Sequence, residues 1–360
     1  MKTGLLIYGP LDTLSGGYLY DRKLVEYLRA HGDEVEIISL PWRSYPLHLL
    51  DNLSFRLPSK LDILIEDELN HPSLLGANAR RGAYPVVSLV HHLRSSEQHP
   101  EWLMPLYRRV ERRYLNSVDG FIFNSETTRK VVSGLAGEKV PSLTAFPPTD
   151  RFGAGRPEQE VLARASEKGP LRLAFLGNVI PRKGLETVLS ALKLLPEGFT
   201  LDVIGSLEMD RAHAKRMQKM TQAAGLAQRV IFHGALDAQA LAAMLSQAQV
   251  LVVPSSYEGF GIVYLEGMAF GLPAIGSTAG AAGELIKDGE TGYLVRAGDA
   301  ESLARRLDGL AQDRDLLGSM SLKALRRYRQ QPTWEQTAAN IRQFLRALVI
   351  SPATSRVKPA

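Results

Sequence analysis

The sequence predicts an α/β protein built from two doubly wound, Rossmann-like domains. Short apolar runs alternate with amphipathic stretches along the chain, which is the pattern of strands and helices on a parallel sheet. The chain has 360 residues, enough for two domains with cores of their own. A stretch rich in proline, glycine and charge at 146–169 separates two such series and is interpreted as a linker. We therefore place the domains at 1–165 and 166–332.

The first series begins directly at the N-terminus. Its expected strands cover 4–8, 35–39, 61–65, 85–90 and 120–123. A loop with Gly16 and Gly17 leads into a helix that ends near Ala30. The segment 41–58 holds several aromatics and prolines with little periodicity, so we expect an irregular insertion on the acceptor side or a plain surface loop.

The second series follows the linker. Its expected strands cover 171–176, 201–204, 230–232, 250–253 and 273–276. One helix is expected to begin at Leu185, and another is expected to end at Ala224. Helices are also expected over much of 300–328 and over 333–350, where the pattern is amphipathic. Residues 351–360 are expected to be disordered.

The composition excludes several classes of protein. There is no cysteine, so neither a disulfide framework nor a thiolate metal site can form. The chain enters its first strand without a signal-peptide pattern, and no apolar run approaches transmembrane length. We expect a cytoplasmic protein.

Basic residues gather in the first half of a chain whose formal net charge is only +5. The cluster comprises Arg80, Arg81, Arg94, Arg108, Arg109, Arg112 and Arg113. Within it, residues 106–115 (LYRRVERRYL) form an amphipathic basic helix. This helix is either a solvated face or a peripheral contact with the inner face of an anionic membrane through Arg108–Arg113. No nucleic-acid-binding motif is present, so nucleic acid is not an expected partner.

The most informative stretch is 257–273, YEGFGIVYLEGMAFGLP, which follows an apolar strand. The turn Gly259-Phe260-Gly261 opens a helix whose residues, beginning with Ile262 and Val263, are apolar nearly all round, so the helix should be buried. Nevertheless Glu266 lies on it, and Glu258 precedes it. A buried carboxylate is costly without a partner, and backbone N–H groups at a glycine-started helix can hold a phosphate. The pattern suggests a ligand with hydroxyls and a phosphate; the alternative is a purely structural strand–turn–helix.

This stretch resembles the E-x7-E motif of the retaining glycosyltransferases of family 4, which have the GT-B fold. The resemblance covers nearly the whole chain and is stronger in the second half. It implies two Rossmann-like domains facing across a cleft, with the helix at 333–350 crossing back to the first domain. It also implies that Glu258 meets the transferred sugar and Glu266 the nucleotide ribose.

Two adjacent cations follow the strand at 171–176, in the sequence GNVIPRKG. The carboxyl end of such a strand faces the crevice where α/β sheets bind ligands. The resembled family has G-R-x-x-x-x-K-G here, with both basic residues on the diphosphate. Lys183 matches the lysine, Asn178 replaces the arginine, and Arg182 is expected to supply the missing charge. Two solvated surface cations are the alternative.

Glycines and a histidine carry the expected chemistry of the first domain. The resemblance implies that the loop with Gly16 and Gly17 closes over the donor, although a tight helix entry also explains these glycines. It also places His91, at the end of the strand 85–90, beside the transferred sugar. We expect His91 to orient the sugar and to support positive charge at its anomeric carbon. His92 stands where the family often has aspartate.

Three further positions complete the expected site. Gly205 and Ser206 after one strand, and His233 at the end of another, would lie near the nucleotide base. Asp313-Arg314-Asp315 resembles a metal-binding D-x-D but lies in a charged helical stretch, so it is interpreted as surface. No other carboxylate or histidine cluster has metal spacing. We expect no metal and no cofactor, with Arg182, Lys183 and helix N–H groups neutralising the diphosphate.

The expected function is transfer of a sugar from a nucleoside-diphosphate sugar, with UDP favoured, to a hydroxyl of a lipid, a glycan or a small molecule. Anomeric configuration would be retained, and domain closure would bring His91 to the Glu258 side. The rivals are a nucleotide-sugar epimerase, a phosphorylase of the same fold, and a non-catalytic nucleotide-sugar-binding protein. A Rossmann dehydrogenase is disfavoured because no G-x-G-x-x-G follows a strand.

Overall fold

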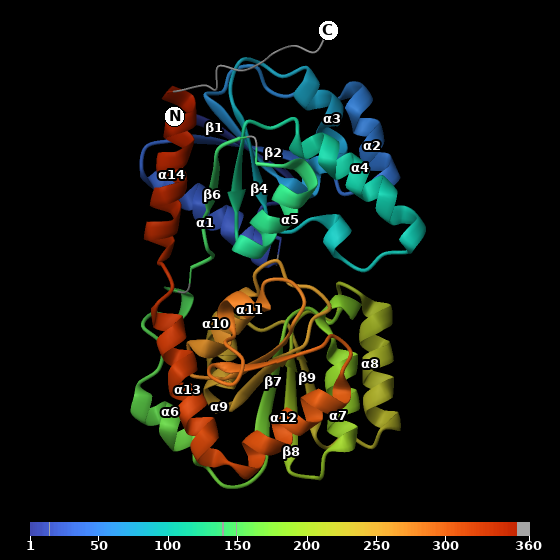
Figure 1. The fold of residues 1–360 in the computed structure, drawn as a ribbon, viewed down its shortest axis with the longest axis vertical. Coiled ribbons are helices and arrows are strands. Elements are labelled where there is room, and N and C mark those ends of the chain that lie inside the picture. Colours follow the sequence, from blue (N-terminus) through green and yellow to red (C-terminus); the bar gives the residue numbers. More distant parts are fainter. Residues whose placement is uncertain (14, 139, 149, 351–360) are drawn as a thin grey trace. The chain divides into compact units, whose positions relative to one another are not determined.

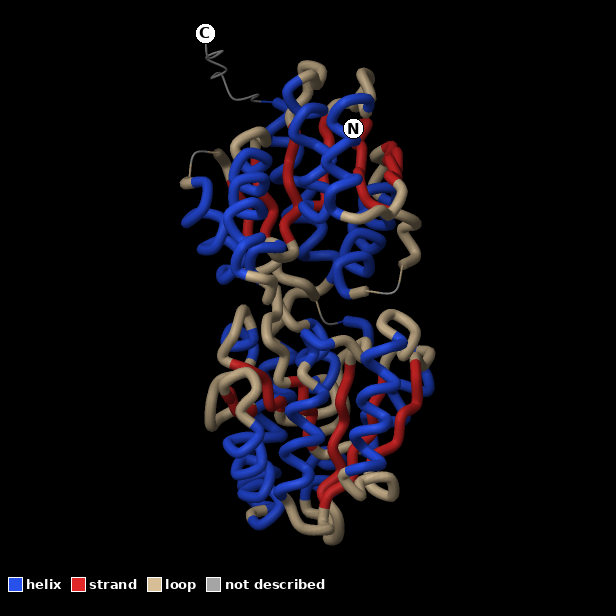
Figure 2. Tube along the Cα trace, turned by 90° about the vertical axis from the view of Figure 1, so that its right-hand side faces the viewer, coloured by secondary structure: helices blue, strands red, loops and turns tan. Residues whose placement is uncertain are grey.

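The computed structural model describes residues 1–13, 15–138, 140–148 and 150–350 and divides the chain into two compact units. The first unit is formed by Met1–Pro148 together with the chain from Pro332, and the second by Thr149–Gln331. Each described unit has one parallel six-stranded sheet with helices around it (Figures 1 and 2). The predicted α/β class is confirmed.

The sheet of the first unit has the order β2-β1-β3-β4-β5-β6. Its strands are β1 (Lys2–Tyr8), β2 (Glu34–Leu40), β3 (Ile63–Asp67), β4 (Val86–Val90), β5 (Gly120–Phe123) and β6 (Ser142–Thr144). Both faces of the sheet are covered, because parallel strands need helical crossovers that pack on the sheet. The strands read as apolar runs for this reason, and β3 and β4 are buried throughout.

Two apolar clusters lie on the two faces of this sheet. The first-unit helices are α1 (Gly16–Ala30), α2 (Tyr45–Ser54), α3 (His71–Ala79), α4 (Met104–Leu115), α5 (Glu126–Ala136) and α14 (Trp334–Ile350), with short 3₁₀ turns η1 (Glu68–Asn70), η2 (Arg94–Ser96) and η3 (Glu101–Leu103). Side chains of α1 and α14 form one cluster with alternate strand residues such as Leu5 and Ile7. Side chains of α3, α4 and α5 form the other with residues such as Leu6 and Tyr8. The alternation of strand side chains therefore builds both cores.

The last helix, α14, packs against α1 and is part of the first unit. Its apolar side chains, including Ile341 and Leu345, enter the α1 cluster. Arg342 Nε donates to Asp33 Oδ2 at 2.6 Å, and the N-terminal ammonium lies 2.8 Å from Asp33 Oδ1. Burial raises and the two cations lower the pKa of Asp33, and the net direction is downward. The return of the chain is therefore held by both apolar and charged contacts.

The sheet of the second unit has the order β12-β11-β10-β7-β8-β9. Its strands are β7 (Leu171–Leu176), β8 (Phe199–Ile204), β9 (Val230–Gly234), β10 (Val250–Val253), β11 (Ala274–Ser277) and β12 (Gly292–Val295). Its helices are α6 (Glu158–Ala165), α7 (Leu185–Leu194), α8 (Arg211–Ala223), α9 (Ala238–Gln247), α10 (Ile262–Met268), α11 (Ala282–Leu285), α12 (Ala300–Gln312) and α13 (Arg314–Arg329), with 3₁₀ turns η4 (Asp150–Phe152) and η5 (Pro181–Lys183). The order changes direction between β7 and β10, which is where such sheets bind ligands.

The segment 41–58 is not irregular, because it contains helix α2. This helix buries polar side chains and exposes apolar ones: His48 and Asp51 are buried, whereas Leu50 and Leu53 are 55% and 75% exposed. Asp51 Oδ2 accepts from Ser73 Oγ at 2.8 Å and His48 Nε2 accepts from Arg43 N at 3.2 Å, so the inward face is polar and hydrogen-bonded. The expected apolar inward periodicity is therefore absent, and the sequence pattern does not predict the helix.

The stretch 146–169 is not a linker throughout. It contains α6, which packs against α13 and places Val161 and Ala165 in the interior of the second unit. The boundary between the units therefore falls at 148/149 instead of 165/166. Pro157, just before α6, starts the helix, and the two glycines upstream of it, Gly153 and Gly155, have positive φ.

Smaller differences concern strand ends. Strand β3 runs to Asp67 rather than ending at Ile65, so Glu66 and Asp67 are buried strand residues. Strands β6 and β12 were not predicted; both are short and end the sheets. Asp313 caps α13 by accepting from the amide of Leu316, which gives the D-R-D sequence a structural role. The predicted disorder of 351–360 lies outside the described residues.

Candidate active site

Two neighbouring strands of the second unit bring the principal predicted residues together. Strands β7 and β10 pair in parallel, so their carboxyl ends lie at the same edge of the sheet. The turn after β7 carries Arg182 and Lys183 in η5, and the loop after β10 carries Glu258. Gly184 fixes the approach of the two segments, since a Cβ on it would lie 2.4 Å from Pro254 O and its φ is +76°. The close contact therefore requires glycine.

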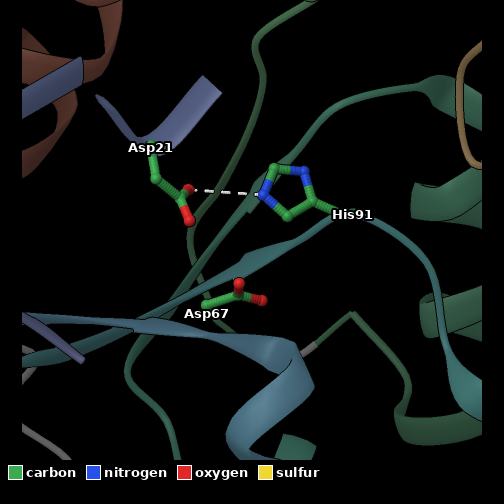
Figure 3. A group of neighbouring side chains, drawn as sticks. All are labelled: Asp21, Asp67 and His91. Atoms are coloured by element: carbon green, nitrogen blue, oxygen red, sulfur yellow. Dashed lines mark hydrogen bonds and ion pairs between the residues drawn. The ribbon is translucent and has the colours of Figure 1, made fainter. Parts of the chain in front are cut away.

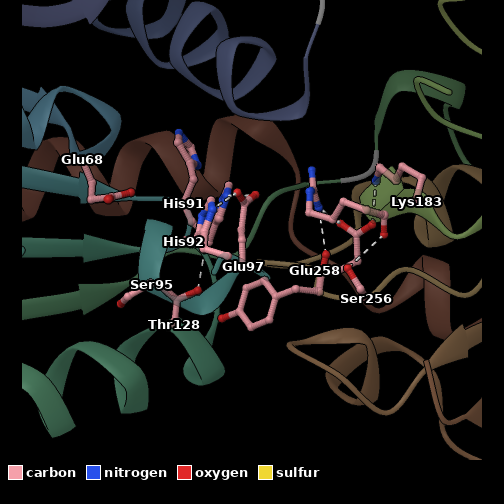
Figure 4. A network of polar contacts seen from close by, with 12 residues as sticks. Glu68, His91, His92, Ser95, Glu97, Thr128, Lys183, Ser256 and Glu258 are labelled. Carbon is pink, nitrogen blue, oxygen red and sulfur yellow. Dashed lines mark hydrogen bonds and ion pairs between the residues drawn. The ribbon is translucent and has the colours of Figure 1, made fainter. Parts of the chain in front are cut away.

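Glu258 is the centre of a buried polar cluster. Lys183 Nζ lies 2.6 Å from Glu258 Oε1 (Figure 4). Ser255 Oγ lies 2.6 Å from the same oxygen, and Arg182 Nη1 lies 3.7 Å from Oε2. Arg182 Nη1 also donates to Tyr257 O at 2.8 Å. Burial alone would raise the pKa of Glu258, but the charges of Lys183 and Arg182 outweigh it and lower that pKa. Glu258 is therefore a carboxylate held between two cations.

The backbone around Glu258 is also fixed. Ala281 N donates to Glu258 O at 2.8 Å, and Gly280, with φ +72°, packs so closely that a Cβ would lie 2.2 Å from the same oxygen. After Glu258 the chain turns through Gly259, Phe260 and Gly261 into α10. The carboxylate is thus oriented by the loop that carries it.

The helix expected to hold a phosphate at its start, α10, is short. Helix α10 has seven residues, Ile262–Met268, so its aligned peptide dipoles are few. Gly261 is the N-cap of α10 with φ +91°, and a Cβ there would lie 2.5 Å from the ring of Tyr264. The backbone conformation and the close contact therefore both require glycine at this position. Ile262 and Val263 form the first turn.

Glu266 has a partner that the sequence did not predict. The residue is 8% exposed on α10, and its Oε1 accepts from Arg151 Nη1 of η4. Burial raises the pKa of Glu266, and the charges of Arg151 and, more weakly, Lys183 only partly oppose that effect. The carboxylate expected to meet a ribose is thus paired with an arginine of its own unit.

The remaining predicted positions of the second unit lie after β7, after β8 and near the carboxyl end of β9, at the same edge. Gly205, with φ +150°, packs against the turn after β7, since a Cβ would lie 2.0 Å from Gly177 O. His233 Nε2 lies 2.7 Å from Asp202 Oδ1 of the adjacent strand. Asn178 Oδ1 accepts from Ser206 N at 3.3 Å, so the residue that replaces the expected arginine joins two loops.

In the first unit the structure brings the glycine loop and His91 together. Ser15 caps α1 by accepting from Tyr18 N, and Gly16 and Gly17 form its first turn. A Cβ on Gly17 would lie 3.2 Å from the Cδ2 atom of His91, so the absence of a side chain lets the helix start against the imidazole. His92 turns to another partner, with its Nε2 3.0 Å from Glu97 Oε1 (Figure 4).

The sequence prediction missed a carboxylate–histidine cluster. A carboxylate oxygen of Asp21, a carboxylate oxygen of Asp67 and a ring nitrogen of His91 all lie within 4.8 Å of one another (Figure 3). The three residues come from α1, β3 and the loop after β4. Adjacent strands β3 and β4 explain the meeting of Asp67 and His91. The periodicity of α1 could have indicated Asp21, since it shares the buried face with Tyr18 and Val25. Arg151 had no such signal, because it lies in the stretch interpreted as a linker.

The basic cluster of the first unit is divided by function. Arg81 donates to both oxygens of Asp119 at 2.7 Å, and Arg94 lies over the rings of Tyr45 and Tyr107. These two arginines are structural. The exposed members on α4, Arg108, Arg109, Arg112 and Arg113, line a shallow surface pocket.

The second unit thus holds a cation–carboxylate cluster after β7 and β10, at the edge of a parallel sheet where α/β proteins bind ligands. Residues 159–327 match the family described as Glycosyl transferases group 1. These residues, just under half of the chain, carry this glycosyltransferase domain, and the resemblance stated from the sequence is confirmed.

Curated relatives support the same assignment. The chain is 30% identical over 261 residues to the GDP-mannose-dependent alpha-(1-6)-phosphatidylinositol monomannoside mannosyltransferase of Mycolicibacterium smegmatis, covering 67% of this chain and 65% of that protein. The matched region is thus just under two thirds of that relative. The phosphatidyl-myo-inositol mannosyltransferase of Mycobacterium leprae is 25% identical, with 99% of this chain and all of that protein covered.

Solved structures show the fold. Sucrose-phosphate synthase from Thermosynechococcus elongatus superposes with a TM-score of 0.81 at 21% identity, covering 97% of this chain and 99% of that one. Anabaena HepE in complex with UDP and glucose superposes with a TM-score of 0.76 at 19% identity, covering 97% of this chain and 100% of that one. The GT-B fold predicted from the sequence is therefore confirmed.

Proposed function

We propose that this protein is a retaining glycosyltransferase that moves a sugar from a nucleoside-diphosphate sugar to an acceptor hydroxyl without a metal ion. The bond between the anomeric carbon and the diphosphate breaks, and the acceptor oxygen bonds to that carbon on the same face. The acceptor proton passes to the departing phosphate oxygen. Each atom and charge is thereby accounted for within donor and acceptor.

The cluster of Lys183, Arg182 and Glu258 is the observation that carries this proposal. The departing diphosphate gains negative charge in the transition state, and cations that are already fixed stabilise that charge with little reorganisation. Lys183 and Arg182 are held in the turn after β7 and lie within 4 Å of Glu258. When a diphosphate engages the cations, the Glu258 carboxylate is released to accept hydrogen bonds from sugar hydroxyls.

GDP-mannose is the first donor to test. The relatives with 30% identity carry GDP-mannose in their names, which favours it over the UDP-sugar expected from the sequence. UDP-glucose is the second choice, because it is named with a solved structure of the same fold. Among acceptors, the same relatives favour a glycosylated phospholipid over a soluble glycan or small molecule.

The purified chain should catalyse transfer from one of these donors to a phosphatidylinositol-type acceptor. We expect release of the nucleoside diphosphate only with acceptor present, an unchanged rate in EDTA, and an α-linked product from an α-linked donor by NMR. Thermal shift with GDP, UDP and ADP should identify the base, since a ligand at about 100 times its Kd stabilises by roughly 2.7 kcal/mol. Isomerisation of donor alone would instead indicate an epimerase. Binding without any turnover would indicate a non-catalytic protein.

We also propose that α2 and α4 contact an anionic lipid surface, where such an acceptor would reside. Leu47, Leu50 and Leu53 lie three residues apart on α2 and are 48%, 55% and 75% exposed, and the buried polar face of α2 fixes this orientation. Tyr45 of α2 stacks edge-on with Tyr107 of α4 at 4.8 Å, so the apolar helix and the arginine-bearing helix are neighbours. Apolar insertion next to clustered arginine charge suits anionic lipid.

None of the described helices is long and apolar enough to cross a membrane. The contact that we propose is made by α2 and α4 at the surface of the first unit.

Vesicle sedimentation tests this contact. The chain should bind vesicles containing anionic phosphatidylglycerol and not neutral phosphatidylcholine vesicles. R108Q/R109Q/R112Q/R113Q should weaken binding by at least about 100-fold, since each cation near the surface contributes about 1 kcal/mol. L50S/L53S should also reduce binding. K215Q/K219Q, which removes two exposed charges from α8 of the second unit, is a charge control and should leave binding unchanged. The proposal would be overturned if ultracentrifugation showed a dimer formed through α2 and the chain did not bind vesicles.

A further inference from the structure

We propose that Asp21 and Asp67 are positioning residues that hold His91 as a doubly protonated imidazolium and leave its Nδ1–H to donate to an oxygen of the sugar substrate. The inference rests on the proposed function, because it assigns a chemical state to the histidine of that site. It concerns only groups of the first unit.

The geometry places two carboxylates beside one imidazole (Figure 3). Nε2 of His91 lies 3.4 Å from Asp21 Oδ1, and Asp67 completes the group within 4.8 Å. Asp21 and Asp67 are 0% and 2% exposed, so bulk water cannot neutralise them. Two buried carboxylates at this spacing repel unless a cation or a proton lies between them. His91 is the group placed to carry that proton.

The ring is also fixed in orientation. Tyr20 packs edge-on against it with ring centroids 5.5 Å apart, and Gly17 covers the edge that carries Cδ2 and Nε2. The backbone carbonyl of His91 accepts from Asn124 Nδ2 at 2.8 Å. With Nε2 directed at Asp21, and no acceptor for Nδ1 among the described residues, Nδ1 remains for a ligand. The side chain retains 14% exposure.

The surrounding charges favour the protonated form. Burial lowers the pKa of His91, but the hydrogen bond and charge of Asp21, followed by the charges of Asp67 and Glu68, raise it to about 9. Burial and the Asp21 charge raise the pKa of Asp67. The other titratable neighbours of the two aspartates and Glu68 are Tyr18, Tyr20, His92 and Glu111. Tyr18, buried and with a raised pKa, stays neutral and donates to Tyr8 O.

This state changes the role expected for His91. A full positive charge next to an anomeric carbon would oppose, not support, the positive charge that develops there. An imidazolium instead offers two N–H donors, one fixed on Asp21 and one free. Charge-assisted donation from a fixed ring orients a sugar oxygen and selects its stereochemistry. His91 therefore orients the sugar and does not stabilise the cation.

The test is the titration of His91 by NMR in the intact chain labelled with ¹³C-histidine, assigned by the loss of its signal in H91Q. In the wild-type protein His91 should remain imidazolium at pH 7.5 and titrate near pH 9. D21N should move the midpoint down by about 1–3 pH units, because it removes the closest opposite charge. E36Q, an exposed acid on β2, is the matched control and should leave the midpoint unchanged.

D67N provides the second variant if D21N does not fold. It retains the oxygen that accepts from Leu69 N at 3.0 Å and should lower the midpoint less than D21N does. A wild-type His91 that titrates at or below pH 6.5 overturns the proposal, and so does a midpoint that neither variant moves. An added divalent metal that binds Asp21 and Asp67 and lowers the His91 midpoint would also overturn the proposal.

Activity measurements separate this inference from the proposed function. If transfer occurs, the fall of kcat/KM on the alkaline side should follow the His91 midpoint and move to lower pH in D21N, because the donor proton is lost as pH rises through that value. H91Q should lose at least about 100-fold in kcat/KM. If the chain transfers no sugar, the NMR titration still decides the charge state. Full activity in H91Q would overturn the substrate contact alone.

Discussion

Replacing Glu258 with glutamine should lower the kcat of sugar transfer by about 10²–10³-fold, the loss typical of removing one fixed polar group that acts in the transition state. The glutamine side chain has the same shape and keeps an oxygen for Ser255, but it lacks the charge that balances Lys183 and Arg182. Sugar hydroxyls donate more strongly to a carboxylate than to an amide.

Nucleotide affinity should respond in the opposite direction. Lys183 is bonded to Glu258 in the present structure, and a diphosphate must compete for it. The E258Q variant frees Lys183, so we expect its Kd for the nucleoside diphosphate, measured by calorimetry, to be unchanged or lower. K183Q should raise that Kd because it removes a phosphate partner. The two substitutions at one ion pair thus separate catalysis from binding.

The control is E290Q, which neutralises a partly exposed acid of the same unit that pairs with Lys287. It should leave both kcat and Kd at wild-type values, and the thermal midpoint of each variant should be compared before kinetics. A kcat in E258Q within threefold of wild type would show that Glu258 does not act on the transferred sugar.

Much of the second unit could be predicted because local sequence and tertiary position coincide there. Each functional group follows an apolar strand, so the strand pattern alone places Lys183 and Glu258 at one sheet edge. The sequence could not show that they pair with each other, because the adjacency of β7 and β10 depends on the strand order. It also could not show the length of α10, since Ala269–Gly271 continue its apolar composition in a turn.

The first unit was less predictable because its functional groups rely on polar burial. Asp67 was missed because β3 extends into acidic residues, against the expectation that strands end where charges begin. Helix α2 was missed because its inward face is polar. In both cases hydrogen bonds and ion pairs satisfy groups that a hydrophobic pattern places at the surface. Such sites are found from strand order and burial, not from periodicity.

Replacing Glu266 with glutamine should weaken binding of the nucleoside diphosphate by about 10–100-fold, because hydrogen bonds to a charged group contribute roughly 1.5–3 kcal/mol. If Glu266 accepts from the ribose, kcat at saturating donor should stay within a few-fold of wild type. The ribose interaction would be present in both the ground and the transition state, so its loss affects KM.

Arg151 provides the test that distinguishes a ribose acceptor from a structural ion pair. In the present structure Arg151 occupies Glu266 Oε1, so a ribose must displace it or share the carboxylate. R151Q removes this competitor, and we expect its nucleotide Kd to equal or fall below the wild-type value while its thermal midpoint falls, since a buried carboxylate loses its partner. Calorimetry with the nucleoside diphosphate and with the bare diphosphate locates the effect, because only the former carries ribose hydroxyls. If E266Q weakens both ligands equally, or R151Q and E266Q lower stability without changing either Kd, Glu266 serves the fold and not the nucleotide.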